Sequence, residues 1–264
     1  MPEYNIYEVL SKCKGSLKTG ITPEEFAHLT ETQNLCERDL EAISKFLIYL
    51  EGKRIRNTIE DLLRKSRLPL KVPKTFENFT FEVMKGNNVD ALRNLKTLAA
   101  IYNHKNIIFI GPAGTGKTHL AQALGYECCH KGLRTTFLKA TELRDKFSAA
   151  RRTEKTARCL NSLVRPACLI IDEIGHCNFD KENTRLFFDL IDRRYNLEGP
   201  YSTIITSNKM PCFWKDDFDE DDTLLCSLDR IFDQAMIFKL EGESFRGKNA
   251  ETFKLSTERT GSVE

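Results

Sequence analysis

The sequence predicts an α/β domain with a five-stranded parallel sheet, preceded by a small α-helical domain. From about residue 76 onward, short apolar runs alternate with helical segments, which is typical of a parallel sheet covered by helices on both faces. Before residue 73 the chain has helical periodicity and no convincing strand pattern. We therefore expect a helical domain over residues 1–72, an α/β domain over 73–247 and a polar tail over 248–264.

The helical domain is predicted from two signals. Pro23 is expected to open one helix, because proline is favoured at the first helical position. A second helix is predicted because Leu40, Ile43, Leu47 and Leu50 recur three or four residues apart. The segment 53–74 carries eight basic side chains and two acidic ones, and Pro69 and Pro73 are expected to end the helix and form a linker.

The α/β domain is predicted element by element from its apolar runs. Strands are expected at 106–110, 135–139, 168–172, 202–206 and 235–240. Helices are expected at 118–131, from 141 towards 164, at 181–195 and, as a short helix, near 224–232.

A glycine-rich loop between the first strand and its helix fits the pattern G-x-x-x-x-G-K-[ST], in the setting that this pattern requires. Glycines let backbone N–H groups approach phosphate oxygens, and the helix N-terminus adds partial positive charge. Lys117 would reach the outer phosphates, and the Thr118 hydroxyl would ligate Mg²⁺. We expect ATP and Mg²⁺ to bind at Gly111, Pro112, Ala113, Gly114, Thr115, Gly116, Lys117 and Thr118.

Two later strands end in polar residues suited to phosphate chemistry. The apolar run from Cys168 ends in Asp172 and Glu173, which we expect to hold Mg²⁺ and to polarise the attacking water, respectively. Asn208 follows the next strand and would orient water against the terminal phosphate. Taken singly, these residues are also common as helix caps, surface charges and turn residues.

The order of these motifs resembles the AAA+ ATPases, in particular their IstB-like and DnaC-like branch. The resemblance runs from roughly residue 20 to residue 247. It rests on SRLPLKVPKTFENFTF, IIFIGPAGTGKTHLAQALG, CLIIDEIG, IDRRY, TIITSNK, LDRIF and LEGESFR. The SRLPLKVPKTFENF and GESFR segments favour the IstB-like proteins.

The resemblance implies an AAA+ P-loop ATPase core that binds double-stranded DNA and assists the transposase of its insertion sequence. It implies a head-to-tail homo-oligomer, either a ring or a helical assembly. Catalytic roles carry over to Lys117, Glu173, Asn208 and Arg230, and nucleotide contacts to His119 and to Arg246, which would be a further nucleotide sensor. Arg230 matches the arginine finger that completes the neighbouring subunit's site, with a surface arginine paired with Asp229 as the alternative from the residues alone.

The region between the second and third strands is rich in basic residues, with eight basic side chains against three acidic ones over 139–165. Initiator-type AAA+ proteins hold a DNA-gripping helical insertion here. Because no base-reading pattern accompanies the charges, phosphate contacts are expected, with a solvated helix face as the alternative. The DNA contacts are predicted at Arg144, Lys146, Arg151, Arg152, Lys155 and Arg158.

The composition bears on the cellular compartment of the protein. Nine cysteines without a C-x-x-C pair, and a start unlike a signal peptide, predict a cytoplasmic protein. No apolar stretch approaches the length of a membrane span, so we expect no membrane association. An acidic run at 216–222 and the pair His176-Cys177 depart from the family pattern.

Three functions remain as alternatives to a transposase helper. They are a DnaC-like replicative helicase loader, a P-loop kinase for a small molecule, and a scaffold that binds ATP without hydrolysing it.

Overall fold

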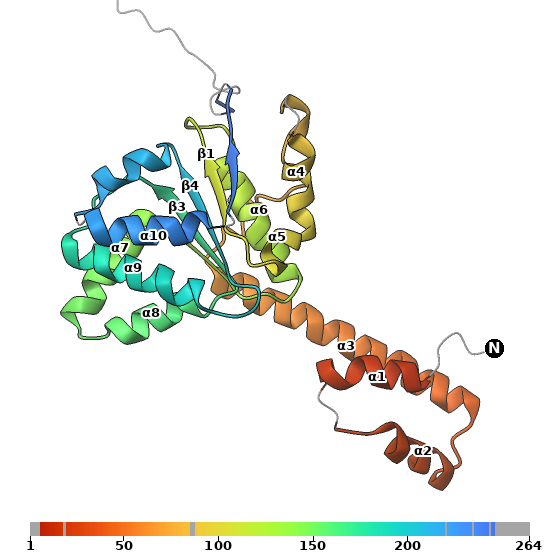
Figure 1. The fold of residues 1–264 in the computed structure, drawn as a ribbon. Helices are drawn as coiled ribbons and strands as arrows, with labels where there is room; N and C mark the ends of the chain where they lie inside the picture. Colours follow the sequence, from red (N-terminus) through yellow and green to blue (C-terminus); the bar gives the residue numbers. More distant parts are fainter. Residues whose placement is uncertain are drawn as a thin grey trace, which may run out of the picture.

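A five-stranded parallel sheet forms the centre of the α/β part of the chain (Figure 1). The computed structural model describes residues 6–17, 20–84, 88–219, 221–233, 235–242 and 244–245. The sheet order is β2-β3-β4-β1-β5, and every neighbouring pair is parallel. The predicted parallel sheet is confirmed, with strands β1 (Ile107–Ile110), β2 (Thr135–Lys139), β3 (Cys168–Ile174), β4 (Ser202–Ser207) and β5 (Met236–Lys239).

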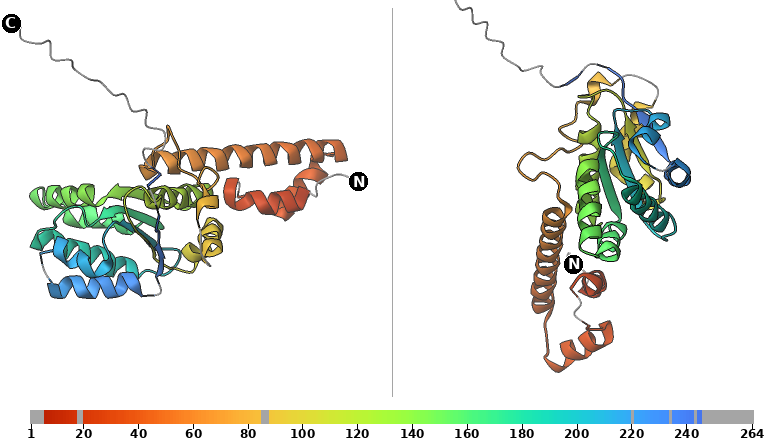
Figure 2. Two further views of the ribbon diagram at one scale, coloured as in Figure 1. Left: turned by 90° about the horizontal axis from the view of Figure 1, so that it is seen from above. Right: turned by 90° about the vertical axis from the view of Figure 1, so that its left-hand side faces the viewer.

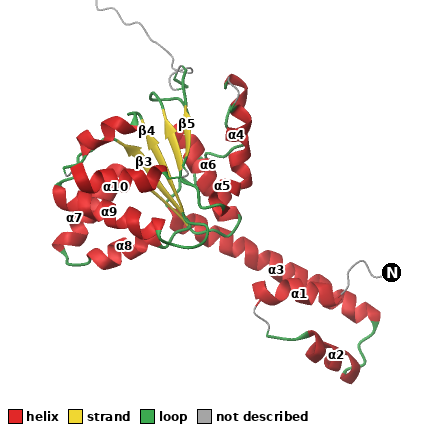
Figure 3. Cartoon of the chain, in the orientation of Figure 1, coloured by secondary structure: helices red, strands yellow, loops and turns green. Residues whose placement is uncertain are grey.

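Helices cover both faces of the sheet (Figure 3). One face carries α6 (Lys117–His130), together with α4 (Val89–Asn94), the 3-10 turn η2 (Leu95–Thr97) and α5 (Ala99–Tyr102). The other face carries α7 (Ala140–Arg152), α8 (Thr156–Val164), α9 (Lys181–Tyr195) and α10 (Asp221–Phe232). Two further 3-10 turns are η1 (Phe81–Val83) and η3 (Pro211–Asp217).

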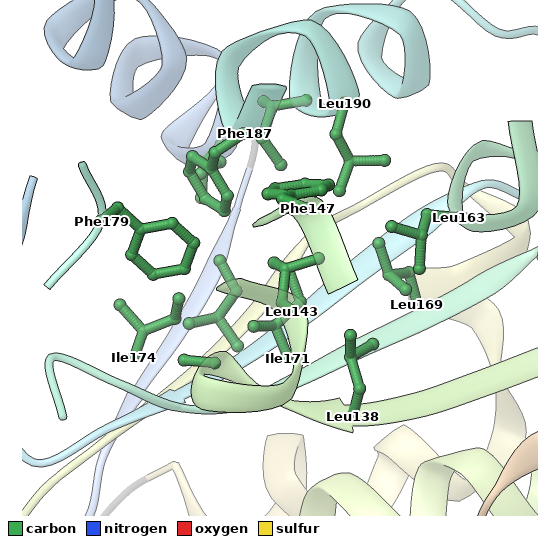
Figure 4. Close-up of a cluster of buried hydrophobic side chains, with 14 of the residues drawn as sticks. Leu138, Leu143, Phe147, Leu163, Leu169, Ile171, Ile174, Phe179, Phe187 and Leu190 are labelled. Carbon is green, nitrogen blue, oxygen red and sulfur yellow. The ribbon is translucent and has the colours of Figure 1, made fainter. Parts of the chain in front are cut away.

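The second face holds a large apolar cluster (Figure 4). Phe147 of α7, Leu163 of α8 and Phe187 of α9 all lie over Leu169 and Ile171 of β3 and are buried. Because β3 is buried on both faces, its side chains are apolar almost throughout, which is why its sequence shows no alternation. The apolar core therefore holds β3 in place, and β3 positions Asp172 and Glu173 near its C-terminal end.

The single helix expected from 141 towards 164 is wrong, because the structure has two helices there. α7 ends at Arg152, and Glu154 takes the left-handed conformation with φ of +53°. The Lys155 N–H then donates to the Ala150 carbonyl at 2.8 Å, and the Glu154 N–H to the Arg151 carbonyl at 3.2 Å. This pair of bonds is a Schellman motif, which usually has glycine at the left-handed position, so the sequence carries no glycine signal for the break.

The N-terminal helical region consists of α1 (Ile6–Leu17), α2 (Pro23–Thr32) and α3 (Glu37–Ser66). Pro23 does begin α2, where the Thr22 hydroxyl accepts from the Glu25 N–H in a capping box. Ile6, Leu10 and Phe26 form a small buried cluster against α3, and α3 extends away from the sheet with α1 and α2 towards its far end (Figure 2).

The C-terminal end of α3 packs on the sheet domain. Leu62 and Leu63 lie against the apolar cluster around α6, and Leu68 is buried there. α3 ends at Ser66, ahead of the two prolines, with Arg67 as a left-handed C-cap whose guanidinium is 2.7 Å from Glu142 of α7. Through the described residues, no helix has both the length and the apolar character needed to cross a bilayer.

Candidate nucleotide-binding site

The glycine loop leaves β1 and delivers the chain into α6. Gly116 is the N-cap of α6 and offers no side chain, so the first-turn N–H groups have no side-chain cap. Gly116 has φ of +94°, and a Cβ there would lie 2.7 Å from the Phe79 ring. Gly114 has φ of +82°, and a Cβ there would lie 1.9 Å from the Ser244 hydroxyl. Only glycine fits these two positions, and the resulting helix N-terminus is suited to an anion.

Lys117 is buried under the loop and is held by the loop itself. Its ammonium donates to the Gly111 carbonyl at 2.7 Å and to the Pro112 carbonyl at 2.6 Å. The Thr115 hydroxyl also donates to the Pro112 carbonyl, at 2.9 Å, and so stiffens the turn. Because a phosphate oxygen is a stronger acceptor than a carbonyl, the ammonium is placed to exchange one for the other.

Thr118 and Asp172, the predicted Mg²⁺ ligands, are in direct contact. The Thr118 hydroxyl donates to Asp172 Oδ1 at 2.8 Å, and the Thr206 hydroxyl of β4 donates to the same oxygen at 2.6 Å. Burial raises the pKa of the Asp172 carboxyl, although both hydroxyl hydrogen bonds pull that pKa down. A hydroxyl and a buried carboxylate at this spacing fit the oxygen ligands that Mg²⁺ prefers.

Glu173 lies one residue further, where β3 departs from regular pairing. The register between β3 and β4 shifts between Ile171 and Ile174, and Glu173 has φ of +61°. Its N–H donates to the Thr206 hydroxyl at 2.9 Å, while its carboxylate is 2.9 Å from the ammonium of Lys139. The hydrogen bond to Glu173 raises the pKa of Lys139, so the lysine is charged and holds this carboxylate by an ion pair.

A pocket at the carboxyl edge of the sheet brings most of the predicted residues together, which is where open α/β sheets bind ligands. Asn208 lies in it, with its amide nitrogen 3.0 Å from the His176 ring nitrogen. The pocket is lined by Lys74, Ala113, Gly114, Gly116, Lys117, Thr118, His119, Gln122, Glu173, Thr206, Asn208 and Phe245.

The segments before and after the sheet close over this pocket. His119 Nε2 is 2.8 Å from the Thr75 carbonyl, and its ring meets Phe79 edge-on at 5.1 Å. Burial lowers the pKa of His119, which favours its neutral form. On the other side, the Phe245 N–H donates to the Gly114 carbonyl at 3.0 Å. Arg246, the predicted sensor, lies outside the described residues.

Arg230 is absent from the residues that line this pocket. It lies on α10, where its guanidinium forms an ion pair with Asp192 at 3.0 Å and sits 5.1 Å above the Phe188 ring. Its partner is therefore Asp192 of α9, whereas the sequence suggested Asp229. Within the described part of the chain, Arg230 Nη1 is buried without a hydrogen-bond partner.

The predicted DNA-binding residues differ in their surroundings. Arg144 pairs with Asp145 at 2.8 Å, and Arg151 pairs with Asp180 at 2.9 Å and reaches Asn183 at 3.2 Å. Arg152 is exposed. The other three, Lys146, Lys155 and Arg158, are exposed and line one groove between α7 and α8.

Sequence comparison places this site within a known family. The model described as IstB-like ATP binding protein matches residues 24–252. The chain belongs to this family. It is 35% identical over 189 residues to the "Insertion sequence IS5376 putative ATP-binding protein" of Geobacillus stearothermophilus, covering 72% of this chain and 73% of that relative. It is 34% identical to the "Insertion sequence IS21 putative ATP-binding protein" of Pseudomonas aeruginosa, covering 78% and 76%.

Solved structures agree with the fold of this IstB-like chain. AMPPCP-bound DnaA from Aquifex aeolicus aligns with a TM-score of 0.54 at 22% identity, over 67% of this chain and 52% of that one. The structure titled "Crystal Structure of the DnaI" aligns with a TM-score of 0.54 at 16% identity, over 69% and 95%. The sheet domain of the IstB-like chain is therefore an AAA+ P-loop fold, and the family is an ATP-binding one.

Several residues of this site were not assigned from the sequence. The place of Thr206 could have been inferred from the sequence. It lies two residues before Asn208 in the T-S-N segment, and side chains two residues apart in a strand point to the same side. Lys139 lies opposite Asp172 in the β2–β3 register, which becomes visible only when the strand order is known. Lys74 and Gln122 also line the pocket, because the segment before the sheet and α6 pack beside the glycine loop in the folded chain.

Proposed function

We propose that this IstB-like protein is a Mg²⁺-dependent ATPase that assembles on double-stranded DNA and assists the transposase of its insertion sequence. The observation that carries the ATPase part is the contact of Thr118 with Asp172, beside Glu173 and beneath the phosphate-binding loop. The relatives named as insertion-sequence proteins support the transposition part. The solved structures support the fold alone and do not favour the helicase-loader alternative.

Different residues of the site would have different roles in hydrolysis. The α6 N-terminus and Lys117 would bind the phosphates. Lys117 would then leave the two loop carbonyls to which it now donates hydrogen bonds. Thr118 and Asp172 would hold Mg²⁺, which neutralises charge that develops on the phosphates. Glu173 would polarise the attacking water once it is free of Lys139, and Asn208 would orient that water.

The test of the proposed function is a strand-transfer assay with the transposase of the same insertion sequence. We expect this protein to stimulate insertion into duplex DNA only when ATP is present, and to release phosphate faster when that DNA is added. A protein that leaves insertion unchanged but captures a hexameric replicative helicase would instead be a loader. Phosphate release only in the presence of a small-molecule acceptor would indicate a kinase.

We propose that each subunit's Arg230 completes the ATP site of the next subunit in a head-to-tail assembly. Support comes from its position outside its own nucleotide pocket and from its buried, unpartnered Nη1 among the described residues. A guanidinium that enters a neighbouring site can stabilise the charge that builds on the terminal phosphate. The ion pair with Asp192 must open for this, and both side chains are about a third exposed, so that the cost is small.

Lys139→Ala is expected to raise ATP turnover in the absence of DNA. The ion pair with Glu173 is half exposed, and freeing the carboxylate at a cost of about 0.5–1 kcal/mol corresponds to about a two- to fivefold higher basal rate. Steady-state phosphate release measures this. Lys139→Arg keeps the charge and should keep the parent rate; a basal rate for Lys139→Ala at or below the parent's would contradict the inhibitory role of this pair.

Lys146→Ala combined with Lys155→Ala is expected to weaken binding to all duplex sequences. Both side chains are exposed in the groove between α7 and α8, so they fit backbone phosphates rather than bases. Removing two phosphate contacts should flatten the salt slope of the binding constant by about 1 to 2. Filter binding at several salt concentrations measures both effects. The control variant Lys45→Ala/Lys65→Ala removes two paired lysines of α3, and equal losses in both variants would refute a specific contact.

A further inference from the structure

Three arginines line one cavity, and of these only Arg158 has a role predicted from the sequence. Arg134 and Arg165 line it together with Arg158, and the remaining lining residues are Asn161 and Ser162. No carboxylate is among these lining residues. Over the residues that the structure describes, none of the three guanidiniums lies within ion-pair distance of an acidic side chain, whereas Arg144, Arg151 and Arg193 all do.

The backbone that carries this arginine cluster, Arg134, Arg158 and Arg165, is held firmly. Arg134 precedes β2, and its carbonyl accepts from the Cys168 N–H at 3.1 Å, which ties it to the start of β3. Arg165 is the C-cap of α8. Behind it, the fully buried guanidinium of Arg194 donates to the Val164 and Pro166 carbonyls at 2.9 and 2.8 Å. The three arginine side chains are exposed, but the backbone from which they extend is fixed.

Converging like charges are unfavourable unless something compensates them. The negative end of the α8 dipole lies near Arg165 and can offset one charge in part, but it cannot offset three. An oxyanion between the guanidiniums would remove the repulsion and accept paired N–H donors from each planar fork. The amide of Asn161 adds a neutral donor, which also suits a phosphate group, whereas the Ser162 hydroxyl donates to the Cys159 carbonyl at 2.6 Å.

The arginine cluster adjoins the groove between α7 and α8. Arg158 lines both cavities, and the groove also contains Lys146 and Lys155, with no carboxylate among the lining residues that the structure describes. Five cationic side chains from α7, α8 and the approaches to β2 and β3 therefore border two adjoining cavities. A duplex backbone provides regularly spaced phosphates along such a path, whereas an isolated small anion would occupy only one cavity.

We propose that Arg134, Arg158 and Arg165 form a second phosphate-binding site for DNA, so that the DNA path continues from the α7–α8 groove onto the amino-terminal edge of the sheet. This site rests on the proposed DNA-binding function and extends it to two residues, Arg134 and Arg165, outside the DNA contacts predicted from the sequence. Its contacts are to backbone phosphates and carry no sequence preference.

The test measures duplex DNA binding of the full-length protein by fluorescence anisotropy between about 50 and 200 mM salt. Arg134→Ala/Arg165→Ala is expected to bind all sequences more weakly and to flatten the salt slope by about 1 to 2, while ATP binding stays at the parent value. Arg134→Lys/Arg165→Lys keeps the charges but loses the planar fork, so it should keep the parent slope with intermediate affinity.

The matched control is Arg64→Ala/Arg193→Ala, which removes the same charge from arginines that are paired with Asp61 and Asp189. It should stay close to the parent. A parent-like slope for Arg134→Ala/Arg165→Ala, alongside a flattened slope for Lys146→Ala/Lys155→Ala, would overturn this second site and leave the proposed function intact. A parent protein that fails to bind duplex DNA at low salt would overturn both.

Discussion

Glu173→Gln is expected to lower DNA-stimulated ATP hydrolysis by about 10²- to 10⁴-fold, the usual contribution of a general base. Glutamine keeps the size of the side chain but accepts no proton from water. ATP binding should change little, because the phosphate-binding groups are on the glycine loop and α6 rather than on β3. Phosphate release gives kcat, and titration with a fluorescent ATP analogue gives the dissociation constant.

The control for this substitution is Glu182→Gln, an exposed residue of the first turn of α9 that pairs only loosely with Arg185, at 3.8 Å. Its turnover should match the parent's. Turnover of Glu173→Gln equal to the parent's would mean that Glu173 is not the base and that the protein works as an ATP-binding scaffold.

Arg230→Ala is expected to lower kcat of the assembled protein by about 10³- to 10⁵-fold, the effect that arginine fingers have on phosphoryl transfer. The ATP affinity of an isolated subunit should not change, because Arg230 lies outside its own nucleotide pocket. The experiment measures turnover and ATP binding at protein concentrations above and below the concentration at which the subunits assemble on DNA.

Asp192→Asn separates this role from a structural one. The substitution breaks the ion pair with Arg230 but leaves the guanidinium free to reach a neighbouring site. We expect Asp192→Asn to keep or exceed the parent turnover. If Arg230→Ala and Asp192→Asn instead lose the same amount of activity and stability, Arg230 serves only to join α10 to α9.

The sheet was predictable where its strands contain continuous apolar runs. β1 is apolar and buried over its whole length, so composition alone marks it, whereas β4 is equally buried but has only Ile204 and Ile205 as apolar residues. The break between α7 and α8 was not predictable, because Glu154 takes a conformation for which glycine is the usual signal. Strand order was also hidden, and without it nothing in the sequence places Lys139 beside Asp172.

The candidate site was predictable where a residue's neighbours in sequence define its role. The glycine loop and Thr118 are fixed by their position between a strand and a helix, and Asp172 by its place at a strand end. Partners from distant segments were not predictable. Arg151 looked available for DNA, yet it pairs with Asp180, 29 residues away in the chain.

Mixing two inactive variants tests the central claim, that ATP lies between subunits, most directly. Arg230→Ala subunits keep Glu173, and Glu173→Gln subunits keep Arg230, so a seam that joins one of each in the right order has a complete site. In a random one-to-one assembly on DNA, one seam in four joins the two variants in this order, so the shared-site account predicts about a quarter of the parent's turnover. A mixture that stays as inactive as the separate variants, although both proteins co-assemble, would contradict it.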